Sequence, residues 1–224
     1  MKPTPVLVGL AALVVVMLAG GTMPNTPKKP AAKLPAEFDR VKMLASKWCR
    51  KFSVPLPLAL MIAQIESSFR PGLFNVNERA MKLGGAWGVV AMTLQTGAGK
   101  VAQIRGNAQL MADPEIAVTL SRWNPGATEA AVKSLITAKN TAELTRLAQP
   151  LLDPDLCLLL GVYMLSGLWY KYKDHLKVAA AYHSGSGTVD KGIAAGNFAA
   201  NLGPAGKEYV SRATTLWPTF QVYA

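Results

Sequence analysis

Apolar residues recur every three or four positions along most of the chain beyond residue 36, the period of a helix that buries one face. Sustained alternation of apolar and polar residues, which indicates a strand, is nearly absent. The pattern predicts helices at 37–52, 56–69, 92–104, 115–122, 128–138, 141–149, 154–171, 175–182, 188–194 and 206–215. We therefore expect a mostly α domain over residues 37–224, which is long enough to bury a substantial core.

One acid stands near the end of the apolar segment Leu58–Phe69. Glu66 shares the predicted helical face of Ala59 and Ile62, and the helix should end soon after it because the residue before Pro71 disfavours helical backbone. A carboxylic acid in low dielectric keeps its proton at higher pH and can donate it to a leaving-group oxygen. The alternative is a solvated residue at a helix end, where the helix dipole disfavours an acid.

The N-terminus differs in composition from the rest. Val6–Gly21 is an unbroken run of apolar and small residues. A membrane-spanning helix needs about 20 such residues, and Ala19-Gly20-Gly21 also suits a signal-peptide cleavage site. We expect residues 1–21 to be either a signal peptide or a membrane anchor, and the Pro- and Lys-rich residues 22–36 to be an extended linker.

Five short motifs follow one another in the predicted domain. They are Glu66-Ser67, Gly88-Val89-Val90-Ala91, Asp153-Pro154, Ala181-Tyr182-His183-Ser184-Gly185 and Tyr209-Val210. In order and approximate spacing they resemble the lytic transglycosylase family with the soluble-lytic-transglycosylase (SLT, lysozyme-like) domain, over about residues 38–217. The resemblance implies a lysozyme-like helical fold that holds peptidoglycan glycan strands in a cleft.

The resemblance also implies roles for individual residues. Glu66 would be the catalytic acid. The substrate-binding residues would be Ser67, Ala91, Thr93, Ala181, Tyr182, His183 and Tyr209. Two positions depart from the family's pattern: Ala91 stands where glutamine is usual, and His183 where asparagine is usual. Both departures affect positions that should face the sugar, so they bear on specificity. We expect the Tyr182 hydroxyl to bond Glu66 or the region near the substrate's N-acetyl group.

Ordinary glycoside hydrolysis uses two carboxylates. No second acid stands in a comparable motif, and Glu78 falls in a predicted loop. The family's single-acid mechanism fits this. It would cleave the N-acetylmuramic acid–N-acetylglucosamine bond without water and leave a 1,6-anhydro end. Two alternatives stay open: a muramidase that hydrolyses the same bond, and a non-catalytic wall-binding or virion structural module.

Other candidate chemistry is sparse. The chain has two histidines and two cysteines, and their spacing matches no metal site. We therefore expect no metal or organic cofactor. Cys49 and Cys157 are either a disulfide or two buried thiols. The chain between Thr96 and Asp153 is longer than is usual in the family. Its helices would line a wall of the sugar cleft, bind a partner or extend the scaffold.

The formal net charge is +11, and basic surfaces attract polyanions. The basic residues are dispersed and form no nucleic-acid motif, so we expect no nucleic acid as a partner. Wall polymer or lipid headgroups are the other candidates, and scattered surface lysines without a specific role are the default interpretation. Lys28, Lys29 and Lys33 follow the apolar run, whereas positive charge favours the cytoplasmic side. We expect a location in the cell envelope, exported or membrane-anchored. From the charge asymmetry we hypothesise a phage-encoded protein that a virion, secretion complex or lysis delivers to the wall.

Overall fold

The computed structural model describes residues 36–224, and the side chains of residues 78 and 79 are excepted. The signal peptide or anchor expected at residues 1–21 and the linker expected at 22–36 therefore fall almost wholly outside the described residues. Within the described part, the fold is mostly α, as the hydrophobic pattern predicts.

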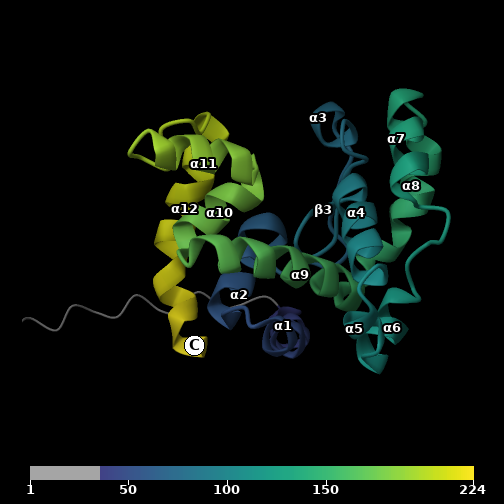
Figure 1. Ribbon diagram of the computed structural model, residues 1–224, viewed down its shortest axis with the longest axis horizontal. Coiled ribbons are helices and arrows are strands. Elements are labelled where there is room, and N and C mark those ends of the chain that lie inside the picture. The colour runs from purple at the N-terminus through teal and green to yellow at the C-terminus, as the bar shows by residue number, and fades with distance from the viewer. Residues whose placement is uncertain (1–35) are drawn as a thin grey trace, which may run out of the picture. The chain divides into compact units, whose positions relative to one another are not determined.

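Helix α9 (Pro154–Tyr172) runs through the middle of the domain (Figure 1). The residues from Leu156 to Val162 are all buried, because neighbouring helices cover this part of α9 on every side. The helix starts at Asp153, whose side chain accepts hydrogen bonds from the backbone of Asp155 and Leu156 and so satisfies two free N–H groups. Pro154 occupies the first turn, where a missing N–H costs nothing.

Two groups of helices lie around opposite ends of α9 (Figure 1). The first group consists of α10 (His175–Ser184), α11 (Ser186–Ala194) and α12 (Pro204–Phe220). The second group consists of α4 (Leu94–Arg105), α5 (Ala108–Met111), α6 (Pro114–Leu120), α7 (Glu129–Thr137) and α8 (Thr141–Ala148). Short 3-10 turns, η1 (Gln149–Leu152) and η2 (Gln221–Tyr223), follow α8 and α12.

Helix α1 (Phe38–Phe52) packs along α9, and α2 (Leu56–Ser67) packs against α12. The chain leaves α2 through two consecutive left-handed residues, Ser68 (φ 52°) and Phe69 (φ 61°). Left-handed backbone is unusual for a bulky side chain. It is held here because the Phe69 ring is fully buried between the rings of Phe38 and Phe220. This exit fixes the direction of the chain directly after Glu66.

A small antiparallel sheet was not predicted. Strands β1 (Phe74–Asn75), β2 (Ala86–Trp87) and β3 (Met92–Thr93) pair in that order. Strands of two residues cannot show a period of two in the sequence. Glu78, expected in a loop, instead begins the four-residue helix α3 (Glu78–Met81), and α5 was also missed. Both are single turns that an asparagine cap holds, so periodicity cannot reveal them.

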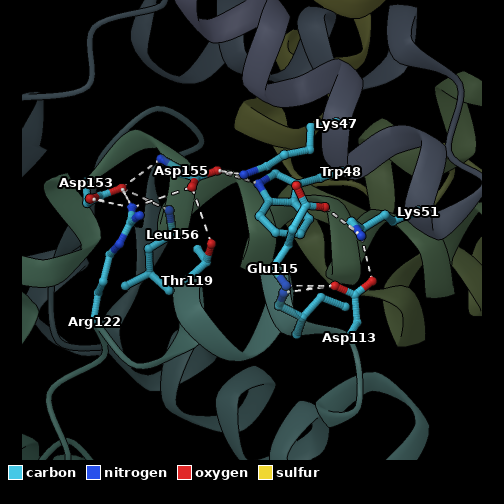
Figure 2. A network of polar contacts seen from close by, with 11 residues as sticks. Lys47, Trp48, Lys51, Asp113, Glu115, Thr119, Arg122, Asp153, Asp155 and Leu156 are labelled. Atoms are coloured by element: carbon cyan, nitrogen blue, oxygen red, sulfur yellow. Dashed lines mark hydrogen bonds and ion pairs between the residues drawn. The ribbon is translucent and has the colours of Figure 1, made fainter.

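A network of charged side chains ties α6 to α1 and α9 (Figure 2). Asp155 on α9 accepts from Trp48 Nε1 at 2.9 Å and lies 2.7 Å from Lys47 Nζ. Arg122 reaches both Asp153 and Asp155. At the other end, Lys51 of α1 pairs with two acids at the start of α6, Asp113 and Glu115.

Cys49 on α1 and Cys157 on α9 are both buried and unpaired, so the structure has two thiols and no disulfide between them. Burial raises the pKa of Cys49 to about 12 and that of Cys157 to about 11.

Within residues 36–224 no single helix has the length and apolarity to cross a membrane. The helical segments 141–152 and 154–172 are long and apolar enough only when taken together, and they are bent by 89° relative to each other.

Candidate active site

Glu66 lies in the last turn of α2 and faces α12. Tyr209, from the second turn of α12, donates its phenol hydrogen to Glu66 Oε1 at 2.7 Å. The contact joins residues that are 143 positions apart in the chain. Glu66 is partly buried, so it is not a solvated residue at a helix end.

The environment raises the pKa of Glu66 from 4.5 to about 7. Removal of water from the carboxylate is the largest cause, because low dielectric disfavours the charged form. The Tyr209 hydrogen bond and the positive charge of Arg212 act in the opposite direction. Burial and the nearby Glu66 raise the pKa of Tyr209 well above its usual value, so Tyr209 stays a hydrogen-bond donor near neutral pH.

Arg212 stands one turn beyond Tyr209 on α12. Its Nη2 donates to the backbone carbonyl of Ile65 at 2.9 Å. The last carbonyls of a helix lack partners within the helix, and a cation there is favourable. Arg212 therefore caps the same helical turn that carries Glu66, and Tyr209 and Arg212 together fasten that turn to α12.

The loop between β2 and β3 forms the floor beside Glu66, and buried hydroxyls hold it. Ser67 Oγ lies 2.7 Å from the carbonyl oxygen of Val89, and Tyr182 Oη donates to the next carbonyl, that of Val90, at 2.7 Å. Ala91 follows in left-handed backbone (φ 47°). These contacts fix the backbone of the loop at the point where it passes the acid.

Two expectations change with this geometry. Ser67 is 2% exposed and does not line the cleft, so it positions the loop and is not placed to contact a sugar. Tyr182 bonds the Val90 carbonyl, and the hydroxyl that bonds Glu66 belongs to Tyr209. Sequence spacing could not distinguish the two tyrosines, because both lie far from Glu66 in the chain.

Gly88 starts this loop with φ 75°. A Cβ atom there would lie 2.2 Å from the carbonyl oxygen of Leu151 and 2.8 Å from Cys157 Sγ. The loop therefore packs directly on α9 and η1 only because this residue has no side chain.

A cleft of about 1070 Å³ opens beside Glu66. Of the expected binding residues it is lined by Ala91, Thr93, Ala181, Tyr182 and His183. Residues that line it and were not expected include Asn75, Asn77, Thr96, Lys100, Met164, Leu168, Lys171 and Ser186. A smaller pocket of about 300 Å³ shares Glu66, Asn75, Ala86 and Ala91 with the cleft. Glu66 thus lines both cavities.

Two of the expected lining residues have clear local roles. Thr93 caps α4, since its Oγ1 accepts from the backbone N–H of Thr96 at 3.1 Å. The ring of His183, which is exposed to the cleft, stacks on Tyr209 with centroids 4.6 Å apart. His183 therefore covers the tyrosine that bonds Glu66.

The missed lining residues carry little sequence signal. Asn75 and Asn77 belong to the unpredicted β1–α3 segment. Thr96 and Lys100 do repeat with Thr93 at helical spacing, so a search for a polar helix face could have found them.

Helices α5–α8 contribute nothing to the cleft. Instead α7 and α8 line a separate pocket of about 650 Å³ with Val76 and Met81. Of the alternatives for the chain between Thr96 and Asp153, lining the cleft therefore holds for α4 and not for α5–α8.

Among the side chains that the structure describes, Glu66 is the single carboxylate that lines the cleft. Nor do three or more His, Cys, Asp or Glu side chains in that part of the chain gather in a way that could hold a metal ion.

A known protein family matches part of the chain. Residues 116–201 match the family model described as Transglycosylase SLT domain. The mostly α fold is that of this lysozyme-like domain, which confirms the resemblance seen in the sequence, and the domain indicates lytic cleavage of peptidoglycan in general. The match includes Asp153-Pro154 and the Ala181–Gly185 turn, whereas Glu66 and Tyr209 lie outside it. No match to a curated protein was found.

Proposed function

We propose that this SLT protein cleaves the β-1,4 bond between N-acetylmuramic acid and N-acetylglucosamine without water and leaves a 1,6-anhydro end. The observation that carries the proposal is Glu66: a partly buried acid with a pKa of about 7 and no second carboxylate beside it in the cleft, among the side chains described. A group that acts first as acid and then as base works best when its pKa is near the working pH.

In the first step, protonated Glu66 donates its proton to the glycosidic oxygen, and the bond from that oxygen to the anomeric carbon breaks. The N-acetyl oxygen of the substrate stabilises the positive charge that develops on the anomeric carbon. Glu66 is left as a carboxylate. The Tyr209 hydroxyl, 2.7 Å away, then stabilises that charge, because a hydrogen bond to the ionised form favours it.

In the second step, the Glu66 carboxylate removes the proton from the C6 hydroxyl of the same sugar. The C6 oxygen bonds to the anomeric carbon, and Glu66 is protonated again. Water is neither consumed nor activated, so no second carboxylate is needed, in contrast to ordinary glycoside hydrolysis. Tyr209 and Arg212 support this cycle because both lower the pKa of Glu66, which burial raises, so that the acid and the carboxylate are both accessible near neutral pH.

The test is the chemistry of the products. Full-length protein and its Glu66→Gln variant are incubated with purified sacculi, and the soluble fragments are analysed by mass spectrometry. Anhydro-muropeptides from the wild type alone support the proposal. Reducing ends would indicate a muramidase. Binding to sacculi without any fragments would indicate a wall-binding or virion structural module.

We further propose that residues 1–21 bring the domain to the cell envelope, as a cleaved signal or as a membrane anchor, with residues 22–36 as the tether. The support is the apolar run Val6–Gly21. The three lysines after this run would disfavour ordinary export, because positive charge favours the cytoplasmic side. We therefore propose delivery by a phage or by lysis. Fractionation of uninfected cells that express the protein tests this, since efficient appearance of the domain in the periplasm would contradict phage-dependent delivery.

A further inference from the structure

One wall of the cleft carries a cation that the proposed mechanism does not use. Thr93, Thr96 and Lys100 follow one another at helical spacing along α4, and all three line the cleft. Lys100 therefore lies about 10 Å along the helix from Thr93, which caps α4 beside the floor loop. Across the cleft, the face of α9 is largely apolar, with Met164, Gly167 and Leu168.

The ammonium group of Lys100 uses only part of its hydrogen-bonding capacity in this position. Its Nζ donates to the neutral Gln103 Oε1 at 2.9 Å and lies 6.0 Å from the centroid of the Tyr163 ring on α9. Among the described residues, no acidic side chain forms an ion pair with Lys100. Burial lowers its pKa from the usual value, which indicates that the ammonium has lost part of its hydration.

Lys171 provides the contrast within the same cleft. It lies on α9, is more exposed, and its Nζ is 2.5 Å from Asp190 Oδ2. That ion pair already neutralises Lys171 inside the protein. Lys100 has three ammonium hydrogens and one neutral acceptor, so it retains the capacity to bind an anion that enters the cleft.

We propose that Lys100 binds a carboxylate of the substrate, so that the cleft selects glycan strands with acidic substituents over uncharged ones. This rests on the proposed function, because it names the substrate of that same cleft. In peptidoglycan such a carboxylate has two sources: the lactyl group of muramic acid without a peptide, or the peptide attached to it. The chemistry is the same, a carboxylate beside the sugar chain, and the experiment separates the sources.

The experiment measures binding rather than cleavage. Full-length Glu66→Gln protein, which keeps the ligand intact, is titrated with three soluble ligands: peptide-bearing glycan strands, strands from which an amidase has removed the peptides, and N-acetylglucosamine oligomers of similar length. Each titration is repeated after Lys100→Gln and Lys100→Arg. Lys133→Gln, on the exposed surface of α7, is the control with the same change in charge.

We expect Lys100→Gln to reduce the preference for acidic strands over the uncharged oligomer by roughly tenfold, the range of one charge-assisted hydrogen bond. Lys100→Arg should restore much of that preference, and Lys133→Gln should leave it unchanged. Added salt should weaken binding of acidic strands less in Lys100→Gln than in the parent. Loss confined to peptide-bearing strands assigns the peptide carboxylate, and loss confined to stripped strands assigns the lactyl carboxylate. Loss with both kinds of strand means that Lys100 binds either carboxylate.

Equal loss for all three ligands would overturn the proposal, because Lys100 would then act only through the shape of the cleft. An equal effect of Lys133→Gln would also overturn it, because overall charge would suffice. A failure of the proposed function is seen separately, as the absence of anhydro products from the wild-type protein, and does not alter these binding ratios.

Discussion

Glu66 and Asp155 are both partly buried carboxylates near a helix end, but their neighbours differ. Glu66 accepts one hydrogen bond from a neutral phenol. Asp155 lies 2.7 Å from Lys47 Nζ and 3.5 Å from Arg122 Nη1 (Figure 2). Desolvation of Glu66 favours a bound proton, whereas Asp155 is paired with two cations. The same chemical group is thus the proposed catalytic acid in one place and a member of an ion-pair network in the other.

The largest expected difference between the two carboxylates is in rate. Glu66→Gln should lower the rate of anhydro-product formation on sacculi by roughly a thousandfold, since a general acid contributes about 10²–10⁴-fold. Asp155→Asn should keep most of the rate per folded molecule, because Asp155 does not line the cleft. Product release per mole of folded protein, from circular dichroism at the assay temperature, measures both. Equal losses would mean that Glu66 has no special role.

The next difference is in stability. Asp155→Ala should lower the free energy of unfolding by about 3 kcal/mol, the range for breaking a buried charged cluster. It leaves Lys47, Trp48 Nε1 and Thr119 without their shared acceptor. Urea unfolding followed by tryptophan fluorescence measures the change. Glu143→Ala is the control, because its exposed pair with Arg146 should contribute little to stability.

The pH dependence of stability should also differ. The pKa of Glu66 is raised from 4.5 to about 7 in the folded state, so folding favours the protonated form. Its contribution is most favourable below about pH 4.5 and is lost as the pH rises through 7. Wild type should therefore lose on the order of 3 kcal/mol relative to Glu66→Gln between pH 4.5 and 8. Parallel unfolding curves for the two proteins over this range would contradict the raised pKa.

The smallest expected effect is that of Tyr209→Phe. Its hydrogen bond lowers the pKa of Glu66, so removal should raise that pKa and move the alkaline limb of the activity profile to higher pH. The loss of rate at the optimum should stay below about tenfold, the value of roughly one hydrogen bond. Activity measured from pH 5 to 9 checks this. Arg212→Met removes the positive charge that also lowers the pKa of Glu66, so it should move the limb in the same direction.

The sequence predicted the helical regions well because their apolar faces repeat over several turns. The site was predicted in part: Glu66, Ala91, Thr93, Ala181, Tyr182 and His183 do line one cleft. Ser67 was misjudged, because a serine beside the acid looks the same in sequence whether its hydroxyl faces a sugar or the Val89 carbonyl. Asn75 was missed because a two-residue strand leaves no pattern.

By itself, the sequence determined what local forces control. Helical period, proline positions and capping residues depend on neighbours within a few positions, so they place Glu66 in the last turn of a helix and start α9 at Asp153. The tertiary structure alone decided what surrounds Glu66. Desolvation of the acid, the Tyr209 hydroxyl and the Arg212 charge all come from packing α2 against α12, across more than 140 positions of the chain. The pKa of an acid depends on its distance in space to other groups, and spacing along the sequence does not give that distance.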